Sequence, residues 1–326
     1  GDKMYEGEFK NGLPHGNVKL ILDEGIGFEG SFRYGIKHGY GVEYIYNNKK
    51  LVKSYTGLWL NGNQEGLHYS KTNWGDKVYI NERNYKNGQW NGPAKEYYIK
   101  DSSLYKYVGN YENCIRHGKG KIYLVSFKPG KEIPNIECEY KNGKKHGEWI
   151  YYVINWDSAI GKNIVNFRRF YNEDQIVKTQ EYLLLKKKDG NGNYLRDAND
   201  ERIIVGSYIW TESLFKNGKM HGLSKRYNNN GNGSIEYLTP YVNGKIHGKA
   251  ITYSNNGDFI AITDEYVNGK KHGKSISYDK NGHISDWGIT YYENGIAVKE
   301  VSDFFKGIYK NDRRYKGTWY EYDDVS

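Results

Sequence analysis

The chain has 326 residues and a formal net charge of +9, and it holds 34 Tyr, 10 Phe and 8 Trp in an otherwise polar composition. A low apolar content alone is typical of disorder, but this many aromatic side chains supplies the buried area that a folded protein needs. Forty Gly against 5 Pro indicate tight turns rather than a Pro-rich linker. Two Cys argue against a disulfide framework, and no apolar run approaches the length of a membrane-spanning helix.

An eight-residue frame recurs along the chain: an aromatic residue, any residue, Asn-Gly, two variable residues and His-Gly. Clear copies begin at Phe9, Phe32, Tyr111, Tyr140, Phe215, Tyr241 and Tyr266. Weaker copies begin at Trp59 and Tyr85, where Glu65 and Asn91 take the histidine position. The closing glycines follow at steps of 23 to 29 residues, except for a step of 75 that equals three steps of 25. Self-similarity at a nearly fixed period indicates a repeat array.

Aromatic and polar residues alternate before each frame, as in Tyr5–Phe9, and again after it, as in Lys119–Tyr123. Period-two alternation around Asn-Gly predicts a β-hairpin, since Asn and Gly tolerate the positive φ of the turn. We therefore predict an all-β fold with almost no helix: an elongated single-layer antiparallel meander of stacked β-hairpin repeats, twisted and curved into a groove. Gly in the middle of the first strand of a hairpin, such as Gly57 or Gly109, leaves room for a neighbouring ring or marks a bend.

The regularity of the repeats suggests three parts. We assign residues 1–147 to an N-terminal repeat array, 148–214 to an irregular insertion or degenerate repeats, and 215–326 to a C-terminal array with degenerate capping units. In the middle part, Gln175–Lys187 and Glu201–Trp210 are expected to form a longer hairpin with a protruding loop. Atypical units at the ends are common in repeat arrays, because one side has no neighbour.

Three stretches, Tyr5–Gly16, Phe28–Gly41 and Tyr107–Gly120, resemble the membrane occupation and recognition nexus (MORN) repeat. Later units, Tyr140–Trp149 and Tyr266–Gly273, are similar to the bacterial variant of that repeat, which occurs in proteins described as antitoxin components. The resemblance implies β-hairpin units in elongated single sheets, a scaffold without a shared enzymatic activity, and membrane or lipid association in some members. The long spacing of the units and the weak region 148–214 depart from the family pattern.

Seven of the nine histidines precede Gly at the same position of the frame. A catalytic residue is normally singular, whereas a structural one repeats with the structure. Neighbouring repeats would also hold these rings about 10 Å apart, too far for one metal ion to join them. We interpret the following as structural positions that cap a turn or pack under the next aromatic residue: His15, His38, His117, His146, His221, His247 and His272, with Gly16, Gly39, Gly118, Gly147, Gly222, Gly248 and Gly273.

The loop that begins at Asp189 weakly resembles a calcium loop, with Asn191, Asn193 and Asp200 following at alternating spacing, but Tyr194 stands where that loop requires Gly. We interpret it as an Asx-rich turn. Motifs for nucleophilic catalysis, phosphate loops, dinucleotides and zinc are absent from the sequence. We therefore predict no catalytic residue, no metal and no cofactor, and an enzyme is the least favoured class, because a deep pocket is hard to build from one sheet.

We predict a non-enzymatic scaffold that binds a protein partner through an aromatic-rich sheet face, in an antitoxin- or immunity-type role or in complex assembly. The candidate contacts are Trp59, Trp90, Trp149, Arg168, Arg169 and Trp210. Attachment to anionic membrane, which the net charge favours, and carbohydrate or cell-wall binding by ring stacking stay open as alternatives. Nucleic acid is not expected, and a homo-oligomer stays open. We expect a cytoplasmic or membrane-peripheral location, with export left open because the sequence does not begin with Met.

Overall fold

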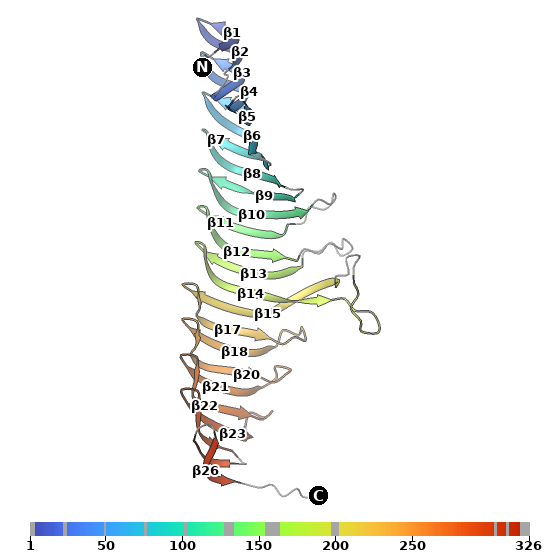
Figure 1. The fold of residues 1–326 in the computed structure, drawn as a ribbon, viewed down its shortest axis with the longest axis vertical. Helices are drawn as coiled ribbons and strands as arrows, with labels where there is room; N and C mark the ends of the chain where they lie inside the picture. Colours follow the sequence, from blue (N-terminus) through green and yellow to red (C-terminus); the bar gives the residue numbers. More distant parts are fainter. Residues whose placement is uncertain are drawn as a thin grey trace. The chain divides into compact units, whose positions relative to one another are not determined.

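The computed structural model describes residues 4–21, 25–48, 50–74, 77–100, 103–126, 134–153, 164–196, 202–302, 305–310 and 313–319. The chain divides into two compact units, Gly1–Ile154 and Asn155–Ser326. The described residues form 26 strands and no helix, so the prediction of an all-β fold is confirmed. In each unit the strands lie side by side in sequence order (Figure 1). No helix capable of crossing a membrane is found in the described part of the chain.

The first unit is an open antiparallel meander in which each strand pairs with the next one along the chain. Among its described residues no pairing joins the first strand to the last, so this sheet is not closed into a barrel. Its strands are β1 (Met4–Lys10), β2 (Leu13–Ile21), β3 (Gly25–Arg33), β4 (Ile36–Asn47), β5 (Lys50–Leu60), β6 (Asn63–Trp74), β7 (Lys77–Lys86), β8 (Gln89–Lys100), β9 (Ser103–Glu112), β10 (Ile115–Ser126), β11 (Ile136–Lys141) and β12 (Lys144–Tyr152).

The second unit repeats this architecture, although two of its hairpins have a second strand that is broken near the histidine of the frame. Its strands are β13 (Val165–Asn172), β14 (Gln175–Lys186), β15 (Ile204–Lys216), β16 (Lys219–Met220), β17 (Gly222–Tyr227), β18 (Ile235–Val242), β19 (Lys245–Ile246), β20 (Gly248–Tyr253), β21 (Ile260–Val267), β22 (Lys270–Tyr278), β23 (Ile284–Glu293), β24 (Ile296–Val301), β25 (Phe305–Lys310) and β26 (Arg313–Trp319). The longer hairpin expected here is β14 paired with β15.

The Asn-Gly pairs form the predicted turns. Asn142 and Gly143 have φ values of 51° and 79°, and the other frames repeat this pair of positive angles. Two positive φ values in succession define a type I′ turn, which matches the twist of the strands that it joins. Glu173 and Asp174 adopt the same conformation, at 48° and 68°, in the turn between β13 and β14. Region 148–214 therefore contains a hairpin with the frame's turn, although neither residue of its Asn-Gly signal is present.

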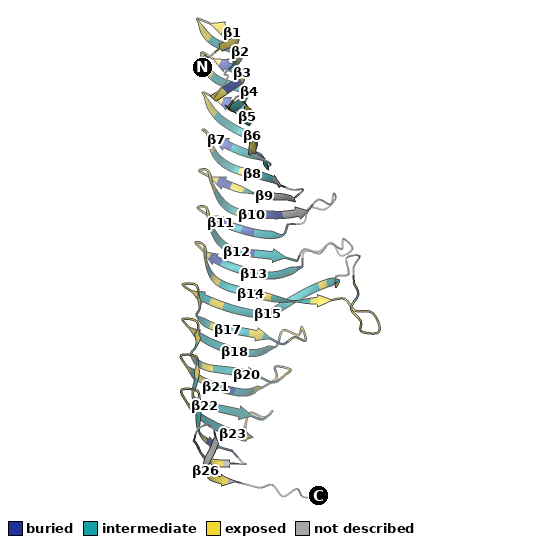
Figure 2. Cartoon of the chain, in the orientation of Figure 1, coloured by how far each residue is buried: buried dark blue, intermediate teal, exposed yellow. Residues whose placement is uncertain are grey.

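The two faces of the first sheet differ. We call the face that carries the aromatic residue of the frame the aromatic face, and the other the open face. On the aromatic face, Phe32, Trp59, Tyr85, Tyr111 and Tyr140 are all buried. Figure 2 colours the buried positions along the strands dark blue. Because side chains alternate along a strand, the open face of the first unit carries Tyr40 and Tyr69, which are 74% and 52% exposed.

Rings of the aromatic face lie over glycines of their own or of a neighbouring strand, which is one of the two roles that the sequence predicted for a mid-strand Gly. A Cβ atom added at Gly41 would lie 2.2 Å from the ring of Phe28, and one at Gly57 would lie 2.4 Å from the ring of His68. Tyr107 covers Gly109 and Gly120 in the same way. These three rings are the largest fully buried side chains of the described residues. A one-layer sheet thus obtains a core without a second layer.

Candidate functional site

The histidines of the frame belong to a ladder along the turn edge of each unit. The Gly N–H of one turn donates to a backbone oxygen of the repeat before it, as from Gly143 to Arg116 at 2.9 Å and from Gly244 to Met220 at 2.8 Å. At some repeats the histidine next to that oxygen adds a second contact: Nδ1 of His117 accepts from the N–H of Asn142 at 3.5 Å, and that of His247 accepts from Asn268 at 3.4 Å. Nδ1 of His38, His146 and His221 is buried without a hydrogen-bond partner among the described residues, so not every repeat makes this contact. The closing glycines have φ values between 61° and 106°, which favour Gly.

Two positions where the frame lapses take part in the same ladder. Glu65, in the histidine position, accepts from the N–H of Asn87 at 2.9 Å, so a carboxylate makes the contact that an imidazole makes elsewhere. Two repeats further on, Cys114 replaces the turn glycine, and its Sγ accepts from the N–H of Trp90 at 3.3 Å. These substitutions preserve the turn-to-turn connection, so the lapses at Glu65 and Cys114 have a structural explanation.

Cationic side chains cover the rings of the aromatic face. Nζ of Lys37 lies 4.7 Å from the ring centre of Phe28 and 4.6 Å from that of Trp59, while Lys145 lies 4.8 Å from that of Trp149. Trp59 and Trp149 are only 5% and 3% exposed, so these two candidate contacts lie within the packing of the sheet. Trp90 is half-buried, with the guanidinium of Arg83 at 3.8 Å from its ring centre.

One cluster on the aromatic face departs from the repeat. Glu96 accepts hydrogen bonds from Arg83, from Arg116 at 2.6 Å and from the hydroxyl of Tyr111 at 2.7 Å. Burial alone would raise the pKa of Glu96, but these donors outweigh it and hold that pKa below its usual value. Arg83 stands where most repeats of the first unit place Gly. These charged side chains therefore occupy a space that an aromatic ring fills in other repeats. Because the carboxylate and the guanidinium groups neutralise one another, the cluster favours a structural role.

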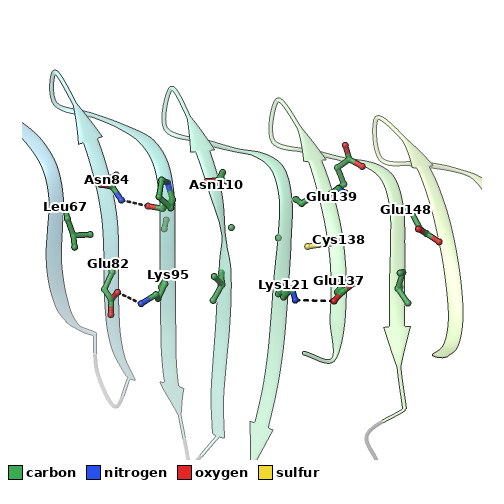
Figure 3. Close-up of a pocket in the computed structure, with 17 residues that line it drawn as sticks. Leu67, Glu82, Asn84, Lys95, Asn110, Lys121, Glu137, Cys138, Glu139 and Glu148 are labelled. Carbon is green, nitrogen blue, oxygen red and sulfur yellow. Dashed lines mark hydrogen bonds and ion pairs between the residues drawn. The ribbon is translucent and has the colours of Figure 1, made fainter. Parts of the chain in front are cut away.

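A shallow groove of about 710 Å³ crosses β6 to β12 on the open face, as Figure 3 shows. Apolar side chains on its walls include Leu67, Pro93, Val108 and Ile150, and the backbone of the glycine-rich strands forms part of its floor. Across the groove, an apolar residue on one strand pairs in register with a polar residue on the next. Leu67 pairs with Asn84, and Val108 pairs with Lys95 on one side and Lys121 on the other.

Charged groups of both signs border this groove. Lys95 pairs with Glu82 at 2.9 Å, and Lys121 pairs with Glu137 at 3.4 Å (Figure 3). Lys119 lies between these pairs in sequence and is exposed. An apolar floor with a charged rim is the arrangement found at protein interfaces, where the rim sets orientation and the apolar centre excludes water.

The second unit brings together three residues singled out from the sequence. Arg168, Arg169 and Trp210 line one depression of about 550 Å³. Trp210 is the extra residue of a β-bulge, because Glu181 and Tyr182 pair with its two neighbours. A bulge re-aims a side chain, and Trp210 also lines a second depression of about 430 Å³. The other residues around that second depression are mostly polar: Arg226, Asn228, Asn229, Glu236, Asn255 and the apolar Leu183.

Comparison with known protein families identifies the repeat. The MORN repeat model matches residues 5–17, 28–49, 139–148, 212–233, 241–259 and 265–283, which lie in both units. The chain is a MORN repeat protein. Over 67 residues, alsin from Rattus norvegicus is 40% identical and alsin from Homo sapiens 39% identical. That match spans 20% of this chain and 4% of alsin, so it concerns a small part of that protein.

MORN repeats are associated with protein and membrane binding, and the family is typically non-catalytic.

In this MORN protein the loop after β14 is built as an Asx turn. Oδ1 of Asp189 accepts from the N–H groups of Asn191 and Asn193, both at 2.9 Å, and Asp279 makes the same contacts with Asn281 and His283. Asp200 lies outside the described residues. Among the residues that are described, no group of three or more His, Cys, Asp or Glu is placed to hold a metal ion.

Proposed function

We propose that this MORN protein is a non-enzymatic scaffold whose first unit binds a protein partner across the groove of the open face. The groove is the observation that carries the proposal: it joins exposed apolar side chains to a rim with both charge signs. The nearby Tyr69 adds an exposed aromatic anchor, and the ring of Tyr40 extends the apolar surface on the same face. Tyrosine is favoured at interfaces, because its rigid ring loses little entropy on binding.

The fitting partner is a polypeptide segment with an apolar stripe between charged flanks. The alternating pairs across β6–β12 offer no deep cavity for a small substrate, whereas a segment that crosses the strands contacts several repeats at once. The proposal takes two forms. In one the partner is a toxin, as the resemblance of the later repeats suggests, and in the other the scaffold assembles a protein complex. The partner-binding role of the six residues named from the sequence remains a prediction.

The test is capture of partners from native lysate on the full chain, followed by reconstitution with each purified candidate. We expect the double variant Leu67→Glu and Ile150→Glu to lose binding of the reconstituted partner by about tenfold or more, since two charges then lie on the apolar wall. The matched control, Val205→Glu and Ile296→Glu, places the same charges at exposed apolar positions of the second unit and should keep full binding. Equal binding by both double variants would refute the groove as the interface.

A second candidate function is carbohydrate binding at Trp210. Its ring borders a depression with the amides of Asn228, Asn229 and Asn255 and the carboxylate of Glu236, and sugars are held by ring stacking together with amide and carboxylate hydrogen bonds. Arg226 lies 5.5 Å from the ring centre of Trp210. Titration with glycans should change the tryptophan fluorescence of the wild type and of Trp287→Phe, whose ring is 74% exposed, but not that of Trp210→Phe. No change in the wild type removes this candidate.

A further inference from the structure

The turn edge of the second unit carries a row of lysines at a fixed spacing. Lys219, Lys245 and Lys270 occupy the same position of three successive repeats. The Cβ atom of each packs near the turn glycine of the next repeat, at 3.8 to 3.9 Å from where a Cβ would stand on that glycine. The turn-to-turn hydrogen bonds of 2.7 to 2.8 Å hold these three positions in line. The row is therefore part of a rigid edge, even though the lysine head groups reach solvent.

These lysines are exposed, and none of the three forms an ion pair within the described residues of this unit. Lys216, which pairs in register with Lys219, adds a fourth positive charge. In the first unit the equivalent positions of the clear repeats are Leu13, Ile36, Ile115 and Lys144, and those of the weaker repeats are Asn63 and Gln89. Lys in three successive repeats is thus a property of the second unit rather than a requirement of the turn.

Exposed aliphatic side chains accompany the lysines. Val242 and Val267 pair in register with Lys245 and Lys270, and both are 41% exposed. Further from the turns, Leu214 and Leu223 are each 39% exposed on the same face, and Leu223 pairs with Pro240. The edge therefore presents a basic row beside an apolar row.

From this arrangement we propose that the lysine edge docks an acidic amphipathic helix of a protein partner, laid across the strands. Two strands per repeat set the lysines about 10 Å apart, and seven residues of an α-helix rise about 10.5 Å. A helix with Glu or Asp at every seventh position meets Lys219, Lys245 and Lys270 in turn. Its apolar stripe then covers Val242, Val267 and the leucines.

The shape of the row favours a helix over a membrane. A single line of charges matches a rod, whereas a lipid surface is contacted over a plane. The apolar side chains beside the lysines are Leu, Val and Pro, not the Trp and Tyr that are enriched at the membrane interface. This surface lies in the second unit, and its occupant is independent of the groove in the first unit.

The test uses the full chain and two synthetic helical peptides of identical composition, each with Leu on one face. In the registered peptide, Glu recurs every seven residues beside the Leu stripe; in the scrambled peptide, the same Glu residues are distributed around the helix. Fluorescence anisotropy should give a dissociation constant about tenfold lower for the registered peptide, with binding weakened in 0.5 M salt, because the Debye length then falls to a few Å. Equal affinities, or no binding of the registered peptide, would overturn the proposal.

The variant Lys219→Gln, Lys245→Gln and Lys270→Gln should lose about tenfold in affinity for the registered peptide. Its control, Lys10→Gln, Lys86→Gln and Lys141→Gln, removes the same charge from exposed turn positions of the first unit and should bind like the wild type. An equal loss in both variants would show a net-charge effect and refute the row. Flotation with phosphatidylserine vesicles that depends on the three lysines, without peptide binding, would assign the edge to a membrane surface instead.

Discussion

The two units build the same hairpin and the same turn ladder, but they fill the middle of the strands differently. In the first unit the row two residues before the frame's aromatic is mostly Gly, and rings such as Phe28, His68 and Tyr107 lie over it. In the second unit that row includes Ser213, Thr239, Asp264 and Thr290, and the aromatics of its regular frames, Phe215, Tyr241 and Tyr266, are only half-buried. The turn therefore fixes the architecture, and the strands are left free to carry either a ring core or a hydrogen-bonded polar surface.

The largest expected difference follows from removing a covering ring. Phe28→Ala should lower the free energy of unfolding of the first unit by about 3–5 kcal/mol, since Phe28 has no exposed surface and its loss leaves a cavity over Gly41. Tyr237→Ala, at the equivalent position in the second unit, should cost about 1–2 kcal/mol because that ring is half-exposed. Urea unfolding followed by circular dichroism measures both, and equal losses would contradict the difference in cores.

Adding a side chain under the ring tests the same contact from the other side. Gly41→Val should destabilise the first unit by about 1–3 kcal/mol, because its Cβ would lie 2.2 Å from Phe28. Ser275→Val occupies the corresponding place in the second unit, where Ile262 stands at the position of Phe28, and should stay within about 0.5 kcal/mol of the wild type. Thermal unfolding of the two variants decides between them; a tolerated Gly41→Val would mean that Phe28 is not fixed.

The charged cluster of the first unit predicts a pH dependence. Glu96→Gln should cost about 1.5–3 kcal/mol at neutral pH, since it leaves Arg83 and Arg116 without their shared carboxylate. The folded-state pKa of Glu96 is lowered, so its contribution is fully present above the unfolded value of about 4.3 and is lost as the pH falls through the folded value. The stability gap between wild type and variant should therefore close at acid pH.

Glu212 gives the comparison in the second unit. Its pKa is also lowered, because bonds from Lys178 and Gln180 outweigh the effect of burial. Glu212→Gln should cost only about 0.5–1 kcal/mol, as its lysine partners are about one-third exposed and screened by solvent. For Glu96→Gln, a difference in unfolding free energy from the wild type that does not change with pH would show that the ionised carboxylate of Glu96 does not stabilise the cluster.

The smallest effect is expected where the units are alike. Glu65→His restores the common residue of the ladder and should change the free energy of unfolding by less than about 0.5 kcal/mol, whereas Glu65→Ala leaves the N–H of Asn87 without its acceptor and should cost about 0.5–1.5 kcal/mol. His247→Glu in the second unit should be tolerated likewise. Hydrogen exchange at the Asn87 amide provides the direct measurement: protection retained in the alanine variant would contradict this role.

The features that recur were predictable from the sequence. Asn-Gly between alternating strands predicted the turns, and the repeated His-Gly was interpreted as structural. Mid-strand glycines such as Gly57 were expected to lie beside a ring or to mark a bend, and Gly57 lies beside a ring. Each of these depends on local conformation or on register within one hairpin. For the same reason, the general fold could be derived without any long-range information.

The features that occur once could not be derived. Arg83, Glu96 and Arg116 lie on different hairpins, and only the register of β7 to β10 brings them together. Glu173 and Asp174 form the frame's turn without its Asn-Gly signal, so that hairpin was not recognised. Trp210 was named as a candidate partner contact, but the bulge that aims it into two depressions depends on how β14 and β15 pair. The three-part division of the chain stays a prediction.

The backbone bonds between successive turns have a consequence for how such a chain changes length. In most repeats the N–H of the turn glycine donates to an oxygen of the repeat immediately before it, as Gly269 does to Ile246 and Gly295 to Lys271. A repeat therefore needs only a neighbour of the same design, not a particular partner elsewhere in the fold. Deleting or duplicating one whole hairpin pair leaves every remaining connection intact. It shortens or lengthens any row of surface side chains by one step of about 10 Å. The length of a binding surface is therefore set by the number of repeats.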